Sequence, residues 1–400
     1  MSTTRPLDGI RVVDLSRYLP GPLVSRILGD LGARVLKIEE PKLGDPSRNA
    51  TQRASDGQSA LATLLLSGHE SIALDLKKKT ALSCLEDLLM DADVLVESFR
   101  PGTLARLGLP PEELRRRYPK LVICSVSGWG QDGPHAGRAG HDVGYLATAG
   151  TLAASPHMPA TQIADVLGGW SGASAVLAAL YKRNESGEGS WIDQSLLDAA
   201  GYAAITAWAA EADGPRDVGE PLMLTGRLPC YKLYKTADDG YLALAALEPH
   251  FWQRFCRAVG RSDLILKQQS TDPAVHAEVA AIIARKSRSE WSEFMDEHDI
   301  PAEPVLSLAE AQEHPQVRHR ELVQQGPDDL PRLGFPALFD GERPRGAAAF
   351  PQIGEQTEAL VNEFQLAHGI SRIQRKRAGI GRRLSIKRWL YKVSRRVVRT

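Results

Sequence analysis

The 400-residue chain is predicted to be an α/β protein with a second, smaller α+β domain, and three features support this fold class. Short β-branched runs alternate with helical patterns through the first half, which is typical of parallel βαβ units. Residues 230–247 instead contain two strand-like runs around Asp238-Asp239-Gly240, a strong hairpin signal. Hydrophobic residues make up 43% of the chain, which is enough for a large core.

The elements are expected in the following order. Strands are predicted at 10–15, 33–39, 71–76, 93–97, 121–125 and 190–193, with helices at 22–31 and 170–183. The hairpin strands are predicted at 231–236 and 241–247, and helical segments at 251–259 and 277–294 follow. A Pro-rich stretch at 327–351 is expected to run back over the surface.

These elements divide the chain into five parts. We expect a large domain at 1–200, a linker at 201–226, a small domain at 227–326, a return segment at 327–365 and a basic amphipathic tail at 366–400. The tail holds 12 Lys and Arg and no Asp or Glu, although the whole chain has 49 residues of each sign. It is either a frayed extension or a helix for an anionic membrane surface, a partner, or nucleic acid bound without sequence specificity.

Several classes of protein are disfavoured by what the sequence lacks. The four cysteines, at 84, 124, 230 and 256, are far apart, and the histidines lack ligand spacing, so we expect neither disulfides nor a metal site. The N-terminus has no signal-peptide pattern and no apolar run approaches the roughly 20 residues of a membrane span, which predicts a cytoplasmic protein. NAD binding is disfavoured because Pro20-Gly21-Pro22 occupies the turn where G-x-G-x-x-G is required.

Three short stretches place a titratable side chain among apolar and small residues. They are Gly140-His141-Asp142, Ala164-Asp165-Val166-Leu167-Gly168-Gly169 and Leu247-Glu248-Pro249. Desolvation in such surroundings shifts pKa values toward the range useful for proton transfer. Each also has a plainer interpretation: His141 as a turn residue, Asp165 as a helix cap and Glu248 as a solvated strand end.

The same stretches carry a family resemblance. With Leu7–Leu15, Leu28–Ala33, Ala92–Gly102 and Asp193–Asp198, they resemble the α-methylacyl-CoA racemases, a branch of the family III CoA-transferase superfamily (CaiB/BaiF type). The resemblance implies a large Rossmann-like domain, a smaller domain and an interlocked homodimer. It also implies an acyl-CoA substrate and no cofactor beyond the coenzyme A moiety of that substrate.

The resemblance further implies residues that hold coenzyme A. These are Lys37, Leu74, Lys77, Arg100 and Tyr145, with Asp142 beside the thioester. The three cations end or follow apolar strands, where they can meet a phosphate at the carboxyl edge of a sheet. Ser67-Gly68-His69-Glu70 departs from the family pattern, which usually carries basic residues there.

Two reactions fit the candidate site. A racemase needs two acid/base groups, His141 and Asp165, with Glu248 orienting His141. A CoA-transferase needs Asp165 alone, as a nucleophile. His141, Glu248 and the lack of a glycine-rich loop near 245–250 favour the racemase, whereas Thr161 stands where the racemase pattern has Asn. A third hypothesis is a CoA-binding protein without catalytic activity.

Overall fold

A computed structural model describes residues 5–50, 57–212, 214–344 and 348–360, arranged in two compact units. The large unit comprises Met1–Ala149, Pro159–Ala203 and Arg320–Thr400, and the small unit comprises Gly150–Met158 and Ala204–His319. The predicted tail at 366–400 lies outside the described residues.

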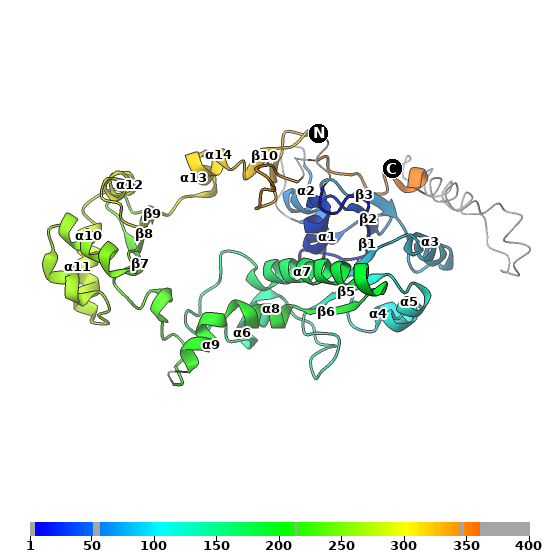
Figure 1. Ribbon diagram of the computed structural model, residues 1–400, viewed down its shortest axis with the longest axis horizontal. Coiled ribbons are helices and arrows are strands. Elements are labelled where there is room, and N and C mark those ends of the chain that lie inside the picture. Colours follow the sequence, from blue (N-terminus) through cyan, green and yellow to red (C-terminus); the bar gives the residue numbers. More distant parts are fainter. Residues whose placement is uncertain (1–4, 51–56, 213, 345–347, 361–400) are drawn as a thin grey trace, which may run out of the picture. The chain divides into compact units, whose positions relative to one another are not determined.

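The large unit is built around a six-stranded sheet in which all strands are parallel (Figure 1). Its strands are β1 (Arg11–Asp14), β2 (Arg34–Glu39), β3 (Glu70–Ala73), β4 (Val94–Glu97), β5 (Val122–Ser127) and β6 (Trp191–Ser195). The spatial order is β3-β2-β1-β4-β5-β6, so the direction of winding reverses between β1 and β4. This is the order of a Rossmann sheet, in which ligands bind at the carboxyl edge near the reversal.

The central strands are largely buried because helices cover the sheet. β4 and β5 are buried at every residue, and Val13, Leu36 and Leu95 lie in the core. The helices of this unit are α1 (Pro20–Asp30), α2 (Ala60–Leu66), α3 (Lys79–Leu89), α4 (Thr103–Arg106), α5 (Pro111–Arg117), α6 (Asp142–Thr148), α7 (Ile163–Ser186) and α8 (Leu196–Ala203), with the 3₁₀ turn η1 (Pro46–Asn49).

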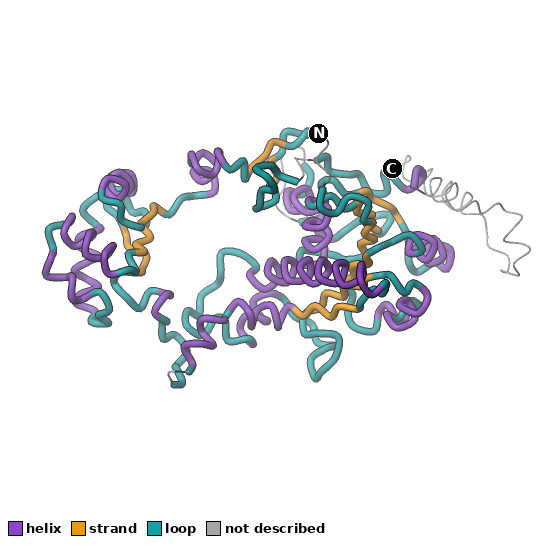
Figure 2. The backbone as a smooth tube through the Cα atoms, in the orientation of Figure 1, coloured by secondary structure: helices purple, strands orange, loops and turns teal. Residues whose placement is uncertain are grey.

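Helix α7 packs against α1, β5, β6 and α8 (Figure 2). Its glycines permit this close approach: a Cβ on Gly168 would lie 2.3 Å from Leu196 Cδ2, and one on Gly169 would lie 2.7 Å from Leu23 Cδ2. The helix starts at Ile163, seven residues before the predicted start at 170, so the pair of glycines lies inside it. Close packing outweighs the low intrinsic helix propensity of glycine here.

Helix α7 is long and apolar enough to cross a membrane by length and composition, with a mean hydropathy of 1.5 over its best window. It is the one such helix among the described residues, and 44% of that window is buried inside the protein. Its tight contacts with α1 and α8 identify it as a core helix of the large unit.

The small unit has its own sheet and its own core. The antiparallel strands β7 (Tyr231–Lys235), β8 (Tyr241–Ala245) and β9 (Ala302–Pro304) form the sheet in that order. The hairpin turns at Asp238-Asp239-Gly240 as predicted, with Asp239 at a φ of 57°. The helical elements are α9 (Ile205–Glu211), η2 (Met223–Thr225), α10 (Pro249–Ala258), η3 (Ser262–Lys267), α11 (Pro273–Ile283), α12 (Arg288–Glu297), α13 (Leu308–Glu313) and α14 (Pro315–His319).

Two sequence expectations are corrected in these regions. The helical segment at 277–294 is two helices, because Ser287 and Glu290 form a capping box that starts α12. The return segment does not simply follow the surface, because its strand β11 (Pro331–Leu333) pairs with β10 (Val323–Gln325), which lies just before it. Arg332 there is fully buried, since its guanidinium binds Asp328 and the carbonyls of Leu330 and Ala348.

The end of the return segment covers the edge of the large sheet. Gln356 N donates to Ser71 O at 3.1 Å, and Ala73 N donates to Thr357 Oγ1 at 3.0 Å. Residues far along the chain therefore satisfy the free edge of β3, which protects it from pairing with other molecules.

Candidate active site

Asp165 occupies the first turn of α7, the third residue of that helix. The packing of Gly168 and Gly169 against neighbouring side chains fixes this turn in the large unit. The side chain of Gln162, the residue before the helix, makes no capping hydrogen bond. The first turn of α7 therefore depends on another element for its cap.

Asp142 supplies that cap from α6. It is the first residue of α6, it is buried, and its Oδ1 accepts the backbone N–H of Asp165 at 3.0 Å. His141 lies directly before it as the N-cap residue of α6, with an exposed side chain. The structure thus brings together Asp142 and Asp165, and His141 directly precedes Asp142 at the start of α6.

The environment of Asp165 changes its acidity strongly. Burial and, to a smaller extent, the neighbouring carboxylate of Asp142 together raise the pKa of Asp165 to about 7. A carboxyl group with a pKa near neutrality is populated in both protonation states at physiological pH. It can accept a proton in one step and return it in another.

Tyr145 is a buried residue of α6, three positions after Asp142. A Cβ on Gly128 would lie 2.2 Å from its hydroxyl and one on Gly140 would lie 2.7 Å from its ring, so both glycines are needed for the ring to fit. Trp129 meets the ring edge-on, with centroids 5.0 Å apart. Burial, then Asp165 and Asp142, raise the pKa of Tyr145 to about 12, which keeps its phenol protonated.

Glu248, the third predicted catalytic residue, belongs to the small unit. It precedes α10 as its N-cap residue and is exposed. His141 belongs to the large unit and Glu248 to the small unit. The contact between them stays a prediction.

Lys37, which the resemblance predicts as a phosphate contact, is a buried residue of the large unit. Its side chain is 1% exposed, and its Nζ lies 3.2 Å from Asp14 Oδ2 and 3.1 Å from Asp45 Oδ2. It also donates to the carbonyl of Ser16. Burial alone would lower the pKa of Lys37, but the two carboxylates outweigh it and raise that pKa. Lys37 is an internal ion-pair partner and does not project from the end of its strand.

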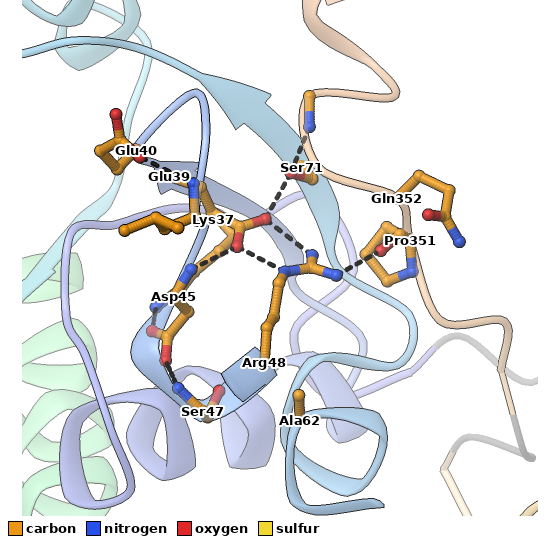
Figure 3. Close-up of polar contacts among 12 residues, drawn as sticks. Lys37, Glu39, Glu40, Asp45, Ser47, Arg48, Ala62, Ser71, Pro351 and Gln352 are labelled. Atoms are coloured by element: carbon orange, nitrogen blue, oxygen red, sulfur yellow. Dashed lines mark hydrogen bonds and ion pairs between the residues drawn. The ribbon is translucent and has the colours of Figure 1, made fainter. Parts of the chain in front are cut away.

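A second buried ion pair continues this network (Figure 3). Arg48 Nε lies 2.7 Å from Glu39 Oε1, and Arg48 Nη1 donates to the carbonyl of Pro351 at 2.9 Å. Ser71 Oγ donates to the other oxygen of Glu39. The network joins β2, η1, β3 and the return segment, so its charges stabilise the fold of the large unit.

The other predicted coenzyme A residues differ in exposure. Leu74 is buried directly after β3, whereas Lys77 and Arg100 are exposed after β3 and β4. Glu70, which departs from the family pattern, forms a bidentate pair with Arg34 across β2 and β3, at 2.7 and 3.0 Å. Its negative charge is thereby compensated within the sheet.

The sequence reasoning assigned no role to Glu97, which the structure shows to be a buried carboxyl. Its Oε2 accepts the N–H of Phe99 at 2.8 Å, and Ser125, which accepts Trp191 Nε1 at 3.1 Å, lies beside it on β5. Burial raises the pKa of Glu97 to about 7. The signal was present, since Glu97 ends the apolar run Val94-Leu95-Val96, but a strand-end Glu is usually solvated.

Comparisons with known proteins agree with this geometry. The chain is 32% identical over 373 residues to the alpha-methylacyl-CoA racemase of Homo sapiens, covering 90% of this chain and 93% of the relative. It is 31% identical over 381 residues to the acetyl-CoA:oxalate CoA-transferase of Acetobacter aceti, covering 90% and 96%. The succinyl-CoA:glutarate CoA-transferase of Mus musculus is 30% identical over 337 residues, covering 80% and 77%.

Solved structures share the fold along most of the chain. A CAIB/BAIF family protein from Brucella suis superposes with a TM-score of 0.81 at 24% identity, covering 90% of this chain and all of that one. A hypothetical protein (Rv3272) from Mycobacterium tuberculosis superposes with a TM-score of 0.77 at 28% identity, covering 89% and 99%. The family model for CoA-transferase family III matches residues 7–357, which span the parallel sheet, the paired carboxylates and the small unit. The chain therefore belongs to CoA-transferase family III, whose members include acyl-CoA racemases and CoA-transferases.

Proposed function

We propose that the protein is a 2-methylacyl-CoA racemase that exchanges the α-proton of its substrate through an enolate. The observation that carries this proposal is the placement of Asp165 at the start of α7, with its pKa raised to about 7. Asp142 links this helix start to the start of α6, which His141 precedes. Racemisation needs a proton carrier on each face of the enolate, and these two residues supply them.

The proton transfers balance over one turnover. The Asp165 carboxylate removes the α-proton from one face and becomes a carboxylic acid, while the His141 imidazolium gives a proton to the opposite face and becomes neutral. The other enantiomer runs the steps in reverse. The first N–H groups of α6 follow His141, and the start of a helix favours negative charge, so they are suited to stabilise the enolate oxygen.

A CoA-transferase is the second candidate, because relatives with that name are nearly as similar as the racemases. In that reaction Asp165 would attack the thioester carbonyl, form a mixed anhydride and release coenzyme A thiolate. Asp165 alone does not distinguish the two reactions, because both use its carboxylate; His141 and Glu248, which the transferase does not need, favour the racemase.

The rest of the proposal concerns binding and assembly. Lys77 and Arg100 are the exposed cations that we propose for the phosphates of coenzyme A, and no cofactor beyond that moiety is required. We also propose a cytoplasmic, interlocked homodimer in which Glu248 orients His141. The basic tail at 366–400 is proposed to contact an anionic surface.

The test is α-hydrogen exchange of a 2-methylacyl-CoA in D2O, followed by NMR. Wild-type protein should exchange the hydrogen, and His141→Ala and Asp165→Ala should each lose at least about 100-fold in rate, as expected for removing an acid/base group. His157→Ala, an exposed histidine outside the site, is the matched control and should exchange normally.

The transferase is tested on the same samples with hydroxylamine present during turnover. An acyl-enzyme at Asp165 would become a hydroxamate, seen as a mass change on its peptide. If the hydroxamate forms and the α-hydrogen is not exchanged, the protein is a CoA-transferase and the racemase proposal is wrong. Binding of acyl-CoA with neither outcome would identify a CoA-binding protein without catalytic activity.

A further inference from the structure

The carboxylate of Asp142 links the two helix starts that carry the proposed acid/base residues. Its Oδ1 accepts the N–H of Asp165, the third residue of α7, at 3.0 Å. That N–H is the one that an N-cap side chain normally satisfies, and Gln162 does not do so. A residue 23 positions earlier in the chain thus completes the cap of α7.

Asp142 cannot be replaced by water in this position without cost, because it is only 9% exposed. A buried N–H that loses its acceptor costs about 1–3 kcal/mol, and a charged acceptor makes the stronger bond. The same residue begins α6, so a shift of its side chain changes the position of His141 relative to Asp165. One hydrogen bond therefore joins the two helix starts that carry the proposed proton carriers.

Asp142 is also the charge that faces Asp165. From α6, Asp142 and Tyr145 face it, and Tyr145 is neutral. From α8, Leu196 and Ala199, which carry no charge, pack against Gly168 of α7, and the one acidic residue of that helix, Asp198, does not affect the pKa of Asp165. Within the described part of the chain, no cation pairs with either Asp142 or Asp165, so the repulsion between them is not compensated.

We propose that Asp142 is a positioning residue that fastens the start of α7 to the start of α6 and sets its own carboxylate beside that of Asp165. The expected effect of Asp142 on turnover rests on the proposed function. The expected effect of Asp142 on the protonation of Asp165 does not, because it can be measured in the substrate-free protein.

Two variants separate the two parts of this role. Asp142→Asn keeps an oxygen acceptor for the Asp165 N–H and removes the charge, whereas Asp142→Ala removes both. Asp272→Asn is the matched control: its Oδ1 accepts the N–H of Ala274 in the same way at the start of α11, in the small unit. The protonation of Asp165 is followed by the pH dependence of carbodiimide labelling of its peptide, read by mass spectrometry.

In Asp142→Asn the labelling midpoint of Asp165 should fall by about 1 pH unit, as expected when a neighbouring like charge is removed. The acid limb of the exchange-rate profile should move by the same amount. Asp142→Ala should lower kcat by roughly 10- to 100-fold with a smaller effect on KM, because the two carriers lose their alignment. Asp272→Asn should leave both the labelling midpoint of Asp165 and kcat unchanged.

An unchanged labelling midpoint in Asp142→Asn, together with kcat close to wild type in Asp142→Ala, would overturn the inference. A loss of thermal stability without a midpoint shift would reduce Asp142 to a structural cap, which also overturns it. If wild-type protein shows no α-exchange, the proposed function fails, but a shifted midpoint in the substrate-free protein still supports the coupling between Asp142 and Asp165.

Discussion

The large unit contains two clusters of buried carboxylates that differ in one respect. Around Lys37, the carboxylates of Asp14 and Asp45 lie within 3.2 Å of an ammonium group. At the start of α7, Asp142 and Asp165 face each other without a cation among the described residues. The first cluster contains one cation for two carboxylates, and the second contains none among the described residues.

The difference separates structure from chemistry on physical grounds. Buried charges of opposite sign hold each other in the ionised state, and their removal damages the fold. Two buried carboxylates without a cation oppose ionisation, so one of them titrates near neutrality. The comparison also explains why the sequence could not separate the buried Lys37 from the exposed Lys77 and Arg100. The neighbours that decide the role of each cation come from other segments of the chain.

The largest expected effect is on the cluster around Lys37. Lys37→Met leaves Asp14 and Asp45 buried without a counter-charge, and the free energy of unfolding should fall by about 3–5 kcal/mol in urea denaturation. Arg116→Ala, which breaks the exposed pair with Glu113, is the matched control and should leave unfolding unchanged within the precision of the measurement. A normal stability with a raised KM for acyl-CoA would instead make Lys37 the phosphate contact that the sequence predicted.

The next effect is on the cluster at the start of α7 and depends on pH. The folded-state pKa of Asp165 is raised from 3.8 to about 7, so its favourable contribution to stability is present below about pH 4 and is lost as the pH rises through 7. Asp165→Asn removes the ionisation. Relative to wild type, the unfolding free energy of the variant should therefore be about 2–3 kcal/mol higher at pH 8 than at pH 5. An equal difference at both pH values would show that Asp165 titrates normally.

The smallest expected effect concerns the third charged region, the tail at 366–400, with its 12 basic residues. A variant ending at Gln365 should keep its α-exchange rate, because every proposed site residue precedes position 250. It should lose binding to anionic vesicles at low salt, measured by co-sedimentation, since exposed charges are screened over about 10 Å at 0.1 M salt. Loss of activity in a truncated protein that remains folded would place the tail within the active enzyme.

Much of the fold could be predicted because it depends on local patterns. The first strand, the following helix and the hairpin of the small unit lie within a few residues of their predicted positions, since apolar periodicity and Asp-Gly turn chemistry are local. The start of α7 was missed because glycines at 168 and 169 lower helix propensity, and only their contacts with Leu23 and Leu196 explain the helix. The split at Ser287 was missed although its capping box is a sequence signal.

By itself, the sequence determined the fold class, the order of the βαβ units and the residue types of the candidate site. It also determined the position of Asp165 next to two glycines and of Asp142 directly after His141. Only the tertiary structure decided which of these charges are compensated. Lys37 meets two carboxylates from other segments, whereas Asp165 meets a like charge 23 residues away. A pKa depends on burial and on neighbours in space, and the order of residues along the chain contains neither.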